Sequence, residues 1–249
     1  MKFTLNYLMI KRLGGLIGLE YNGISPMNEI APDTEELING LPADILSETD
    51  EILKEQGITD GENKPVKPIS AFIKALFAPE KCLRAELKEE SGSSDVYFIP
   101  FDGAWLMMNA KHGELTAAGP VSYEIAKQYI KAALSSALES GVLSVQYRDA
   151  KCKRSVTVTN AEEGYAFFSS LFDNADGKER VYIHSFAKTG ENKKHIAKML
   201  TGEKGFELPD GEMEQQDKLS AKRVLRGIGI ALLVNTCAAV IVAVLKAVL

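Results

Sequence analysis

Six residues of this chain are the types best suited to metal binding or nucleophilic catalysis. They are His112, His184, His195, Cys82, Cys152 and Cys237. The histidines share no metal-ligand spacing, and no two cysteines form a Cys-x-x-Cys pair. Cys152 lies between Lys151 and Lys153, and this electropositive setting is expected to lower the pKa of its thiol. A catalytic thiol also needs an orienting histidine, and the sequence indicates none.

The sequence also lacks the common motifs of catalytic and cofactor sites. It has no phosphate-binding glycine loop, no G-x-S-x-G elbow and no H-E-x-x-H pair. His112, beside Gly113, is expected in a turn, and His184 lies within an apolar strand pattern. We therefore predict no catalytic, cofactor-binding or metal-binding residue, and a protein that is not an enzyme.

The charge of the chain is divided sharply between its two ends. Over 249 residues the formal net charge is −5, yet no acidic residue follows Asp217. Residues 1–217 carry 34 acidic and 24 basic side chains, whereas residues 218–249 carry five basic side chains and no acids. This division predicts an acidic body followed by a basic, apolar tail.

The tail has the length of a membrane-spanning helix. Nineteen uncharged residues run from Gly227 to Leu245. At ~1.5 Å per residue this helix is roughly 28 Å long, close to the ~30 Å hydrocarbon core of a bilayer. The predicted span includes Gly227, Ile228, Leu232, Asn235, Cys237, Val240 and Leu245. A buried C-terminal helix of a globular core is the alternative.

The basic flank of the span indicates its orientation. This flank consists of Lys218, Lys222, Arg223 and Arg226. The positive-inside rule places such a flank in the cytoplasm. We therefore expect a single-pass protein of the cell membrane, in contact with lipid, whose N-terminal domain lies in the cytoplasm.

The hydrophobic periodicity of the body predicts an α+β fold with two antiparallel β-meanders flanked by helices. Apolar residues at helical spacing predict helices, and alternation predicts strands. The predicted helices cover 4–13, 42–56, 70–78, 122–138, 161–172 and 188–199. The predicted strands cover 81–88, 96–99, 104–109, 113–118, 142–148, 151–159 and 180–187. Residues 1–200 form the predicted domain, with halves at 1–120 and 121–200, and 201–217 form a flexible linker to the tail at 218–249.

A winged-helix DNA-binding regulator, anchored in the membrane, is the second reading. Helices 42–56 and 67–78 followed by a hairpin have the order of a winged helix. DNA binding relies on clustered basic residues, but residues 20–62 contain twelve acids and one base, Lys54. Nucleic acid is therefore not an expected partner, and the basic clusters at 151–154 and 188–198 suit anionic headgroups better.

The order of elements resembles that of EspG-type secretion-associated proteins of type VII (ESX) systems and related proteins of Gram-positive type VII loci. An acidic helix ends in a glycine turn in ETDEILKEQGITDGE, and a helix closes with a proline in ISAFIKALFAPEKCLRAEL. A further helix, VSYEIAKQYIKAALSSAL, leads into GVLSVQYRDAKCKRSVTV. The resemblance covers residues 1–187 and includes Gly57, Pro79 and Arg84.

This resemblance implies a pseudo-symmetric sheet flanked by helices and a cytosolic chaperone that binds helical secretion substrates without catalysis. The predicted tail anchor departs from that pattern and favours an adaptor held at the membrane. Our preferred hypothesis is a membrane-tethered, non-catalytic protein-binding adaptor or chaperone-like module. Its expected partner is a helical secretion substrate or a component of the secretion machinery. An enzyme that uses Cys152 is a third alternative.

Overall fold

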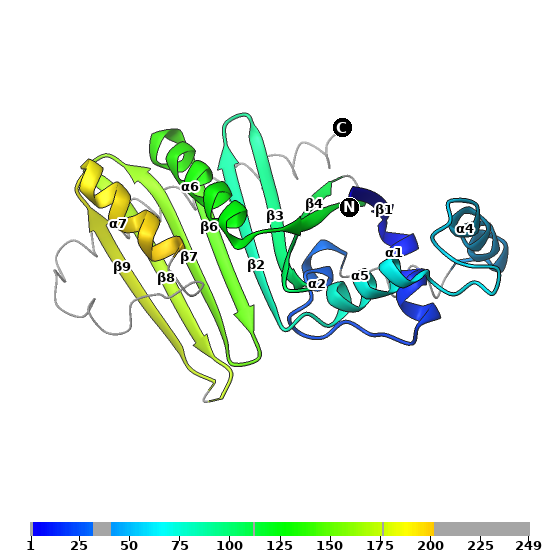
Figure 1. The fold of residues 1–249 in the computed structure, drawn as a ribbon. Helices are drawn as coiled ribbons and strands as arrows, with labels where there is room; N and C mark the ends of the chain where they lie inside the picture. Colours follow the sequence, from blue (N-terminus) through cyan, green and yellow to red (C-terminus); the bar gives the residue numbers. More distant parts are fainter. Residues whose placement is uncertain (1, 32–40, 112, 176, 202–249) are drawn as a thin grey trace, which may run out of the picture.

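The computed structural model describes residues 2–31, 41–111, 113–175 and 177–201. This part of the chain has a mixed α/β fold with a large antiparallel sheet (Figure 1). The helices are α1 (Tyr7–Leu16), α2 (Met27–Ile30), α4 (Ala43–Glu55), α5 (Lys67–Phe77), α6 (Tyr123–Ser140) and α7 (Gly190–Thr201). The strands are β1 (Lys2–Asn6), β2 (Lys81–Glu89), β3 (Gly92–Phe101), β4 (Ala104–Lys111), β5 (Glu114–Val121), β6 (Val142–Asp149), β7 (Cys152–Ala161), β8 (Gly164–Asp173) and β9 (Glu179–Phe186).

The two predicted meanders are present, and they form one continuous sheet. The strand order is β1-β5-β4-β3-β2-β6-β7-β8-β9. The first strands of the two meanders, β2 and β6, pair antiparallel at the centre, with Arg84 opposite Gln146. Read outward from this central pair, each meander follows the order of the chain, and β1 adds one more strand beside β5.

Helices cover the two faces of the sheet over different strands. On one face, α6 and α7 bury Leu134 and Ile196 in a core that includes residues of β2, β3, β6, β7 and β8. Figure 1 shows these two helices lying across the same face. On the other face, α1, α2, α4 and α5 contribute to a second core over β1 to β5, which includes Phe72 and Tyr97. Each core therefore uses a different face of the sheet. Among the described strands, only β2 and β3 have buried side chains in both cores.

The helix predicted over 161–172 is wrong, because this segment contains a hairpin turn and strand β8. Glu162 and Glu163 form the turn between β7 and β8 instead of the first turn of a helix. In β8, Tyr165 and Phe167 are buried on one face while Phe168 points to the other. Hydrogen-bonded ladders to both β7 and β9 stabilise the extended backbone, so tertiary pairing overrides the local helical signal.

The helix predicted over 4–13 begins too early. Residues up to Asn6 form β1, which pairs with β5 and buries Leu5 opposite Leu115. The Asn6 side chain then caps α1 by accepting a hydrogen bond of 2.8 Å from the backbone N–H of Met9. The helical spacing of the later apolar residues was therefore interpreted correctly, and the first apolar residue belongs to a strand.

The N-terminal helices are joined by close packing and an ion pair. The guanidinium of Arg12 in α1 donates hydrogen bonds of 2.7 and 2.6 Å to the carboxylate of Asp50 in α4. Gly14 faces the ring of Phe77 in α5, and a Cβ atom there would approach this ring to 2.1 Å. The absence of a side chain at position 14 thus sets how closely α1 and α5 approach.

The predicted membrane segments cannot be compared with these elements. Within the described ranges, no helix has both the length and the apolar character needed to cross a bilayer. The predicted span at 227–245, its basic flank at 218–226 and residues 202–217 of the predicted linker lie outside the described residues. Thr201, the first residue assigned to that linker, is instead the last residue of α7.

Candidate protein-binding surface

The two meanders differ in how much of their surface the described helices cover. Within β6 to β9, Val145, Val156 and Phe167 point toward α6 and α7, so their sequence neighbours point to the opposite face. Of the described residues, none from β6 to β9 belongs to the second core. We call this opposite side of β6 to β9 the open face. Its side chains include Ser144, Gln146, Arg148, Lys153, Ser155, Thr157, Phe168, Ser170, Phe172, Val181 and Ile183, all exposed or half-buried.

An apolar strip occupies the outer part of the open face. Phe168 on β8 lies opposite Ile183 on β9, and Val181 lies opposite Ser170. Phe172 completes the strip two residues farther along β8 than Ser170. The exposed fraction of Phe172 is 38% and that of Val181 is 50%. Both are therefore large apolar side chains in contact with solvent. Contiguous exposed apolar surface of this kind is typical of protein interaction sites.

The inner part of the open face is polar, and its side chains pair with one another. The hydroxyls of Ser144 and Thr157 lie 3.0 Å apart across β6 and β7. Those of Ser155 and Ser170 lie 2.8 Å apart across β7 and β8. These hydroxyl pairs satisfy their own hydrogen bonds, so the apolar strip is the part of the face that gains most from being covered.

An ion-pair network borders the open face where α2 meets the sheet. The guanidinium of Arg84 donates hydrogen bonds of 2.9 and 2.7 Å to the carboxylate of Asp95 and one of 3.3 Å to that of Glu29. Glu29 also forms an ion pair with Arg148 on β6. The hydrogen bonds that Arg84 donates to Asp95 outweigh burial and raise the pKa of Arg84. The network therefore ties α2 to the centre of the sheet.

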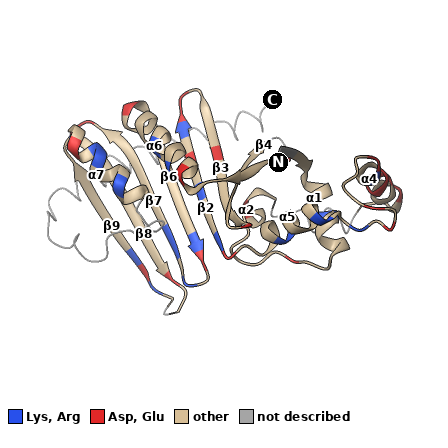
Figure 2. Ribbon diagram, in the orientation of Figure 1, with Lys and Arg blue, Asp and Glu red and all other residues tan. Residues whose placement is uncertain are grey.

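Lys153 supplies a further cation at one end of the open face. It lies opposite Arg148 on β6 and Phe172 on β8. Burial lowers the pKa of Lys153, the positive charges of Arg148 and Arg84 lower it further, and the carboxylate of Glu179 opposes this shift. Glu179 lies opposite Phe172 on β9, so this end of the open face carries charges of both signs. Figure 2 shows the charged residues of β8 and β9 gathered near the strand ends, whereas their middle stretches are uncharged.

The residues that the sequence singled out for chemistry are not assembled into one site. His184 and His195 lie on the other side of the sheet, where each ring is within 6.0 Å of the Phe186 ring. Burial lowers the pKa of His184, as expected for a histidine packed in an apolar strand. Across the described ranges, no three His, Cys, Asp or Glu residues are arranged to hold a metal ion. His112 and Cys237 lie outside those ranges.

The expected activation of Cys152 is wrong. Burial raises the pKa of its thiol and outweighs the opposing hydrogen bond with Arg154. The charges that act on this thiol come from Arg154 and Asp149 instead of from its lysine neighbours. Burial also raises the pKa of Cys82, to about 12. Neither thiol therefore has the low pKa that a cysteine nucleophile requires.

The hairpin that would serve as the wing of a winged helix is built into the sheet. It consists of β2 and β3, which follow α5 directly. Strand β2 pairs with β6 and strand β3 with β4, so both edges of the hairpin are occupied. The hairpin is therefore part of the central sheet, and the winged-helix reading stays an untested alternative.

None of the apolar residues of the open face was selected from the sequence, although Lys153 belongs to the basic cluster at 151–154. Phe168 and Phe172 fell in the segment interpreted as a helix, and Val181 fell in a strand with apolar residues on both faces. A signal was present, because strands that are apolar on both faces are typical of sheets covered on both sides. Here the described helices cover only one side of β8 and β9.

Comparisons with known proteins give little beyond the arrangement of elements. No family model matches the chain, and no curated protein matches its sequence. Among solved structures, the fold is similar to that of a chain in the complex of the Mycobacterium tuberculosis type VII secretion system chaperone EspG5 with the PE25-PPE41 dimer. The match covers 87% of this chain and 100% of the other, at 13% sequence identity and a TM-score of 0.47. A likeness of this degree carries no argument about function.

Proposed function

We propose that the protein is a non-catalytic protein-binding module whose open face receives an amphipathic helix of a partner. The observation that carries this proposal is the apolar strip with two solvent-exposed side chains, Phe172 and Val181. The described helices bury the other side of the same strands. A partner that covered the strip would remove apolar area from water, which stabilises association in proportion to the area buried.

The dimensions of the strip match those of a helix. It spans two neighbouring strands that lie ~4.8 Å apart, and together with their side chains these are about as wide as the ~10 Å diameter of a helix. From Phe168 to Phe172 the strand advances by roughly 13 Å, which corresponds to about nine residues of helix. Two to three turns of helix with one apolar face therefore fit the strip.

Charges of both signs border the strip. Lys153 lies beside Phe172 on β7, and Glu179 lies beside it on β9. The apolar strip therefore specifies the proposed ligand, which is an amphipathic helix.

Substitution on the two faces of the molecule tests this proposal. Val181→Asp places a charge in the strip, and Ile125→Asp places the same charge on α6, on the opposite side, at a residue of similar exposure (43%). Partner recovered with the full chain from native membranes should fall about tenfold or more with Val181→Asp, as for a residue at the centre of an interface. Ile125→Asp should leave recovery unchanged. Equal losses in the two variants, or no loss in either, would contradict the proposal.

The resemblance seen in the sequence suggests which partner this is. We propose a helical secretion substrate or a component of the secretion machinery, in line with the pattern shared with EspG-type proteins in ETDEILKEQGITDGE and ISAFIKALFAPEKCLRAEL. The test is the identity of the partner recovered above. Recovery of only soluble proteins without a helical secretion signal would count against this class.

We further propose that residues 218–249 hold the module at the cell membrane with residues 1–200 in the cytoplasm. The support is the 19-residue uncharged stretch and its basic flank at 218–226. Cell fractionation of the full chain should place it with membranes, and replacing Leu232 and Val240 by Lys should release it. Release of the unaltered chain by high salt alone would exclude a spanning segment.

A further inference from the structure

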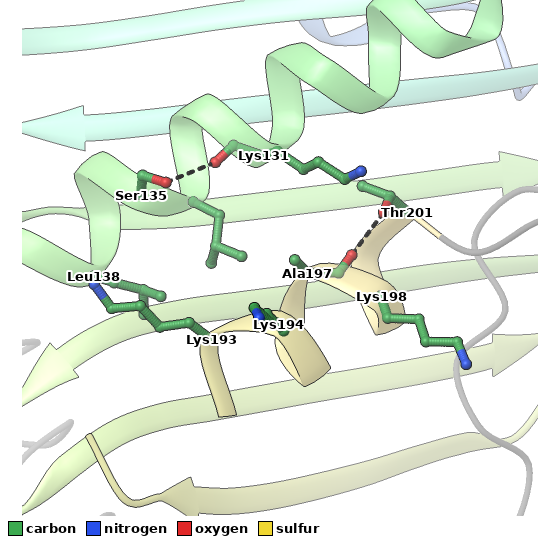
Figure 3. A pocket seen from close by; sticks show the side chains of 9 residues that line it. Lys131, Ser135, Leu138, Lys193, Lys194, Ala197, Lys198 and Thr201 are labelled. Atoms are coloured by element: carbon green, nitrogen blue, oxygen red, sulfur yellow. Dashed lines mark hydrogen bonds between the residues drawn. The ribbon is translucent and has the colours of Figure 1, made fainter. Parts of the chain in front are cut away.

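A groove of about 500 Å³ lies between α6 and α7, on the side of the sheet opposite the open face. One face of each helix lines it, because the lining residues recur at intervals of three and four. From α6 these are Lys131, Leu134, Ser135 and Leu138, and from α7 they are Lys193, Lys194, Ala197, Lys198 and Thr201. Figure 3 shows the lining side chains of both helices, with that of Lys198 extending away from α6.

The groove has an apolar floor and a basic rim. Leu134, Leu138 and Ala197 supply apolar surface, and Leu134 and Leu138 are themselves part of the core beneath. The rim carries Lys131, Lys193, Lys194 and Lys198, and no acidic residue is among the described residues that line the groove. In Figure 3 the Lys131 side chain extends from α6 toward the Thr201 end of α7.

Nearby acids neutralise little of this charge. On α6, Glu124 accepts a hydrogen bond from Lys127, which is the main cause of its lowered pKa, and Lys131 contributes only the smallest effect. On α7, Glu191 lies in the first turn, before the lysines. Lys193 lies 5.9 Å from the centre of the Tyr165 ring. Four lysines around one groove therefore favour an anionic occupant.

The chain itself supplies a segment of matching composition. Thr201 lines the groove, and residues 202–217 follow it directly with the sequence GEKGFELPDGEMEQQD. This segment has six acidic residues and one lysine, and it carries Phe206 and Leu208 between the acids. Its charges complement the rim, and its apolar side chains complement the floor.

The segment is long enough to reach the far end of the groove. From Lys193 to Thr201 the helix advances roughly 12 Å. Six extended residues after Thr201 span about 20 Å, so Glu207 can return along the whole groove. Because the segment is covalently attached, its effective concentration at the groove is on the order of millimolar, which an untethered ligand must match to compete.

We propose that residues 203–217 dock in the groove between α6 and α7, with their carboxylates against the four lysines and Phe206 on the apolar floor. This docking is independent of the open face, which lies on the other side of the sheet.

Zero-length carbodiimide cross-linking of the full chain in mild detergent tests the proposal. The reagent joins a lysine amine to a carboxylate only when the two are in contact. Lys131 is the diagnostic lysine, because it is distant in sequence from the acids at 207–217. Peptide mapping should find Lys131 joined to these acids, with adducts at least about tenfold more abundant than those of the exposed control lysines Lys74 on α5 and Lys111 on β4.

Three further measurements complete the test. The variant Glu207→Gln, Asp210→Asn, Glu212→Gln should lose most Lys131 adducts, and a mixture of isotopically light and heavy chains should show that the adducts form within one chain. Val181→Asp should leave them unchanged, so failure of the proposed function leaves this result intact. Adducts of Lys131 no more abundant than those of the controls, or adducts only between chains, would overturn the docking.

Discussion

Adding one methyl group at Gly14 probes the contact between α1 and α5. In Gly14→Ala the new Cβ would lie 2.1 Å from Cε1 and 2.2 Å from Cζ of Phe77. Carbon atoms in contact lie ~3.5–4 Å apart, so the ring must move by roughly 1.5 Å. Phe77 is fully buried, and the Tyr21 ring packs against it with centroids 4.3 Å apart. The ring therefore has little space into which it can move.

Two opposing effects set the magnitude. Overpacking a core costs about 1–3 kcal/mol, and the size of the required shift places this substitution at the upper end. Alanine in place of glycine within a helix returns ~1 kcal/mol. The net expectation is a loss of about 2 kcal/mol in the free energy of unfolding. For a domain of this size, that corresponds to a fall of roughly 4–8 °C in Tm.

The neighbouring glycine supplies a matched control. A Cβ at Gly15 would meet no atom within 4 Å, so Gly15→Ala should keep the helix-propensity gain and raise Tm by ~2 °C. Both variants of the full chain can be melted in the same detergent and followed by near-ultraviolet circular dichroism. If Gly14→Ala melted at or above the temperature of Gly15→Ala, the account of α1 against α5 would be refuted.

Three further predictions concern single side chains. Arg84→Met should lower the free energy of unfolding, measured by urea titration, by about 2–4 kcal/mol. The substitution removes the cation that Asp95 and the other carboxylates of the network share, at a side chain that is 20% exposed. An unchanged midpoint would contradict this. Maleimide labelling followed by peptide mapping should modify the half-buried Cys152 well before Cys82, whose pKa burial raises to about 12, and the reverse order would be inconsistent with the packing. Burial lowers the pKa of His184 below 6.5, so the unfolded chain binds more protons at this residue and stability falls as the pH drops below about 6.5. His184→Gln should therefore make the unfolding midpoint decline less between about pH 7 and pH 5. Parallel declines in the two proteins would contradict the burial of a neutral His184.

Much of the secondary structure followed from periodicity alone. Strand β2 alternates polar and apolar residues between Lys81 and Lys88, and α6 repeats apolar residues at helical spacing. Both were predicted within a few residues of their ends. Strand β8 was not, because its aromatic residues occupy both faces and its preceding acids resemble the first turn of a helix. In the folded chain, pairing with β7 and β9 decides its conformation.

The candidate site could not be derived from the sequence, because it depends on which helix covers which face. The pattern predicted two meanders but did not show that β2 pairs with β6 or that α5 and α6 lie on opposite sides. Only those relations leave Phe172 and Val181 uncovered by the described helices. The lysine groove has the same origin, because Lys131 and Lys198 are far apart in sequence and meet only when α7 packs beside α6.

The central claim is that the open face binds a helix of another protein, and cross-linking from that face in cells tests it most directly. A photoreactive amino acid at position 181 on β9 and, as control, at position 125 on α6 samples opposite sides of the molecule at similar exposure. We predict an adduct from position 181, with peptides that belong to an amphipathic helical segment of one partner, and none from position 125. Equal adducts from both positions, no adduct at all, or peptides from residues 202–249 of the same chain would contradict the claim.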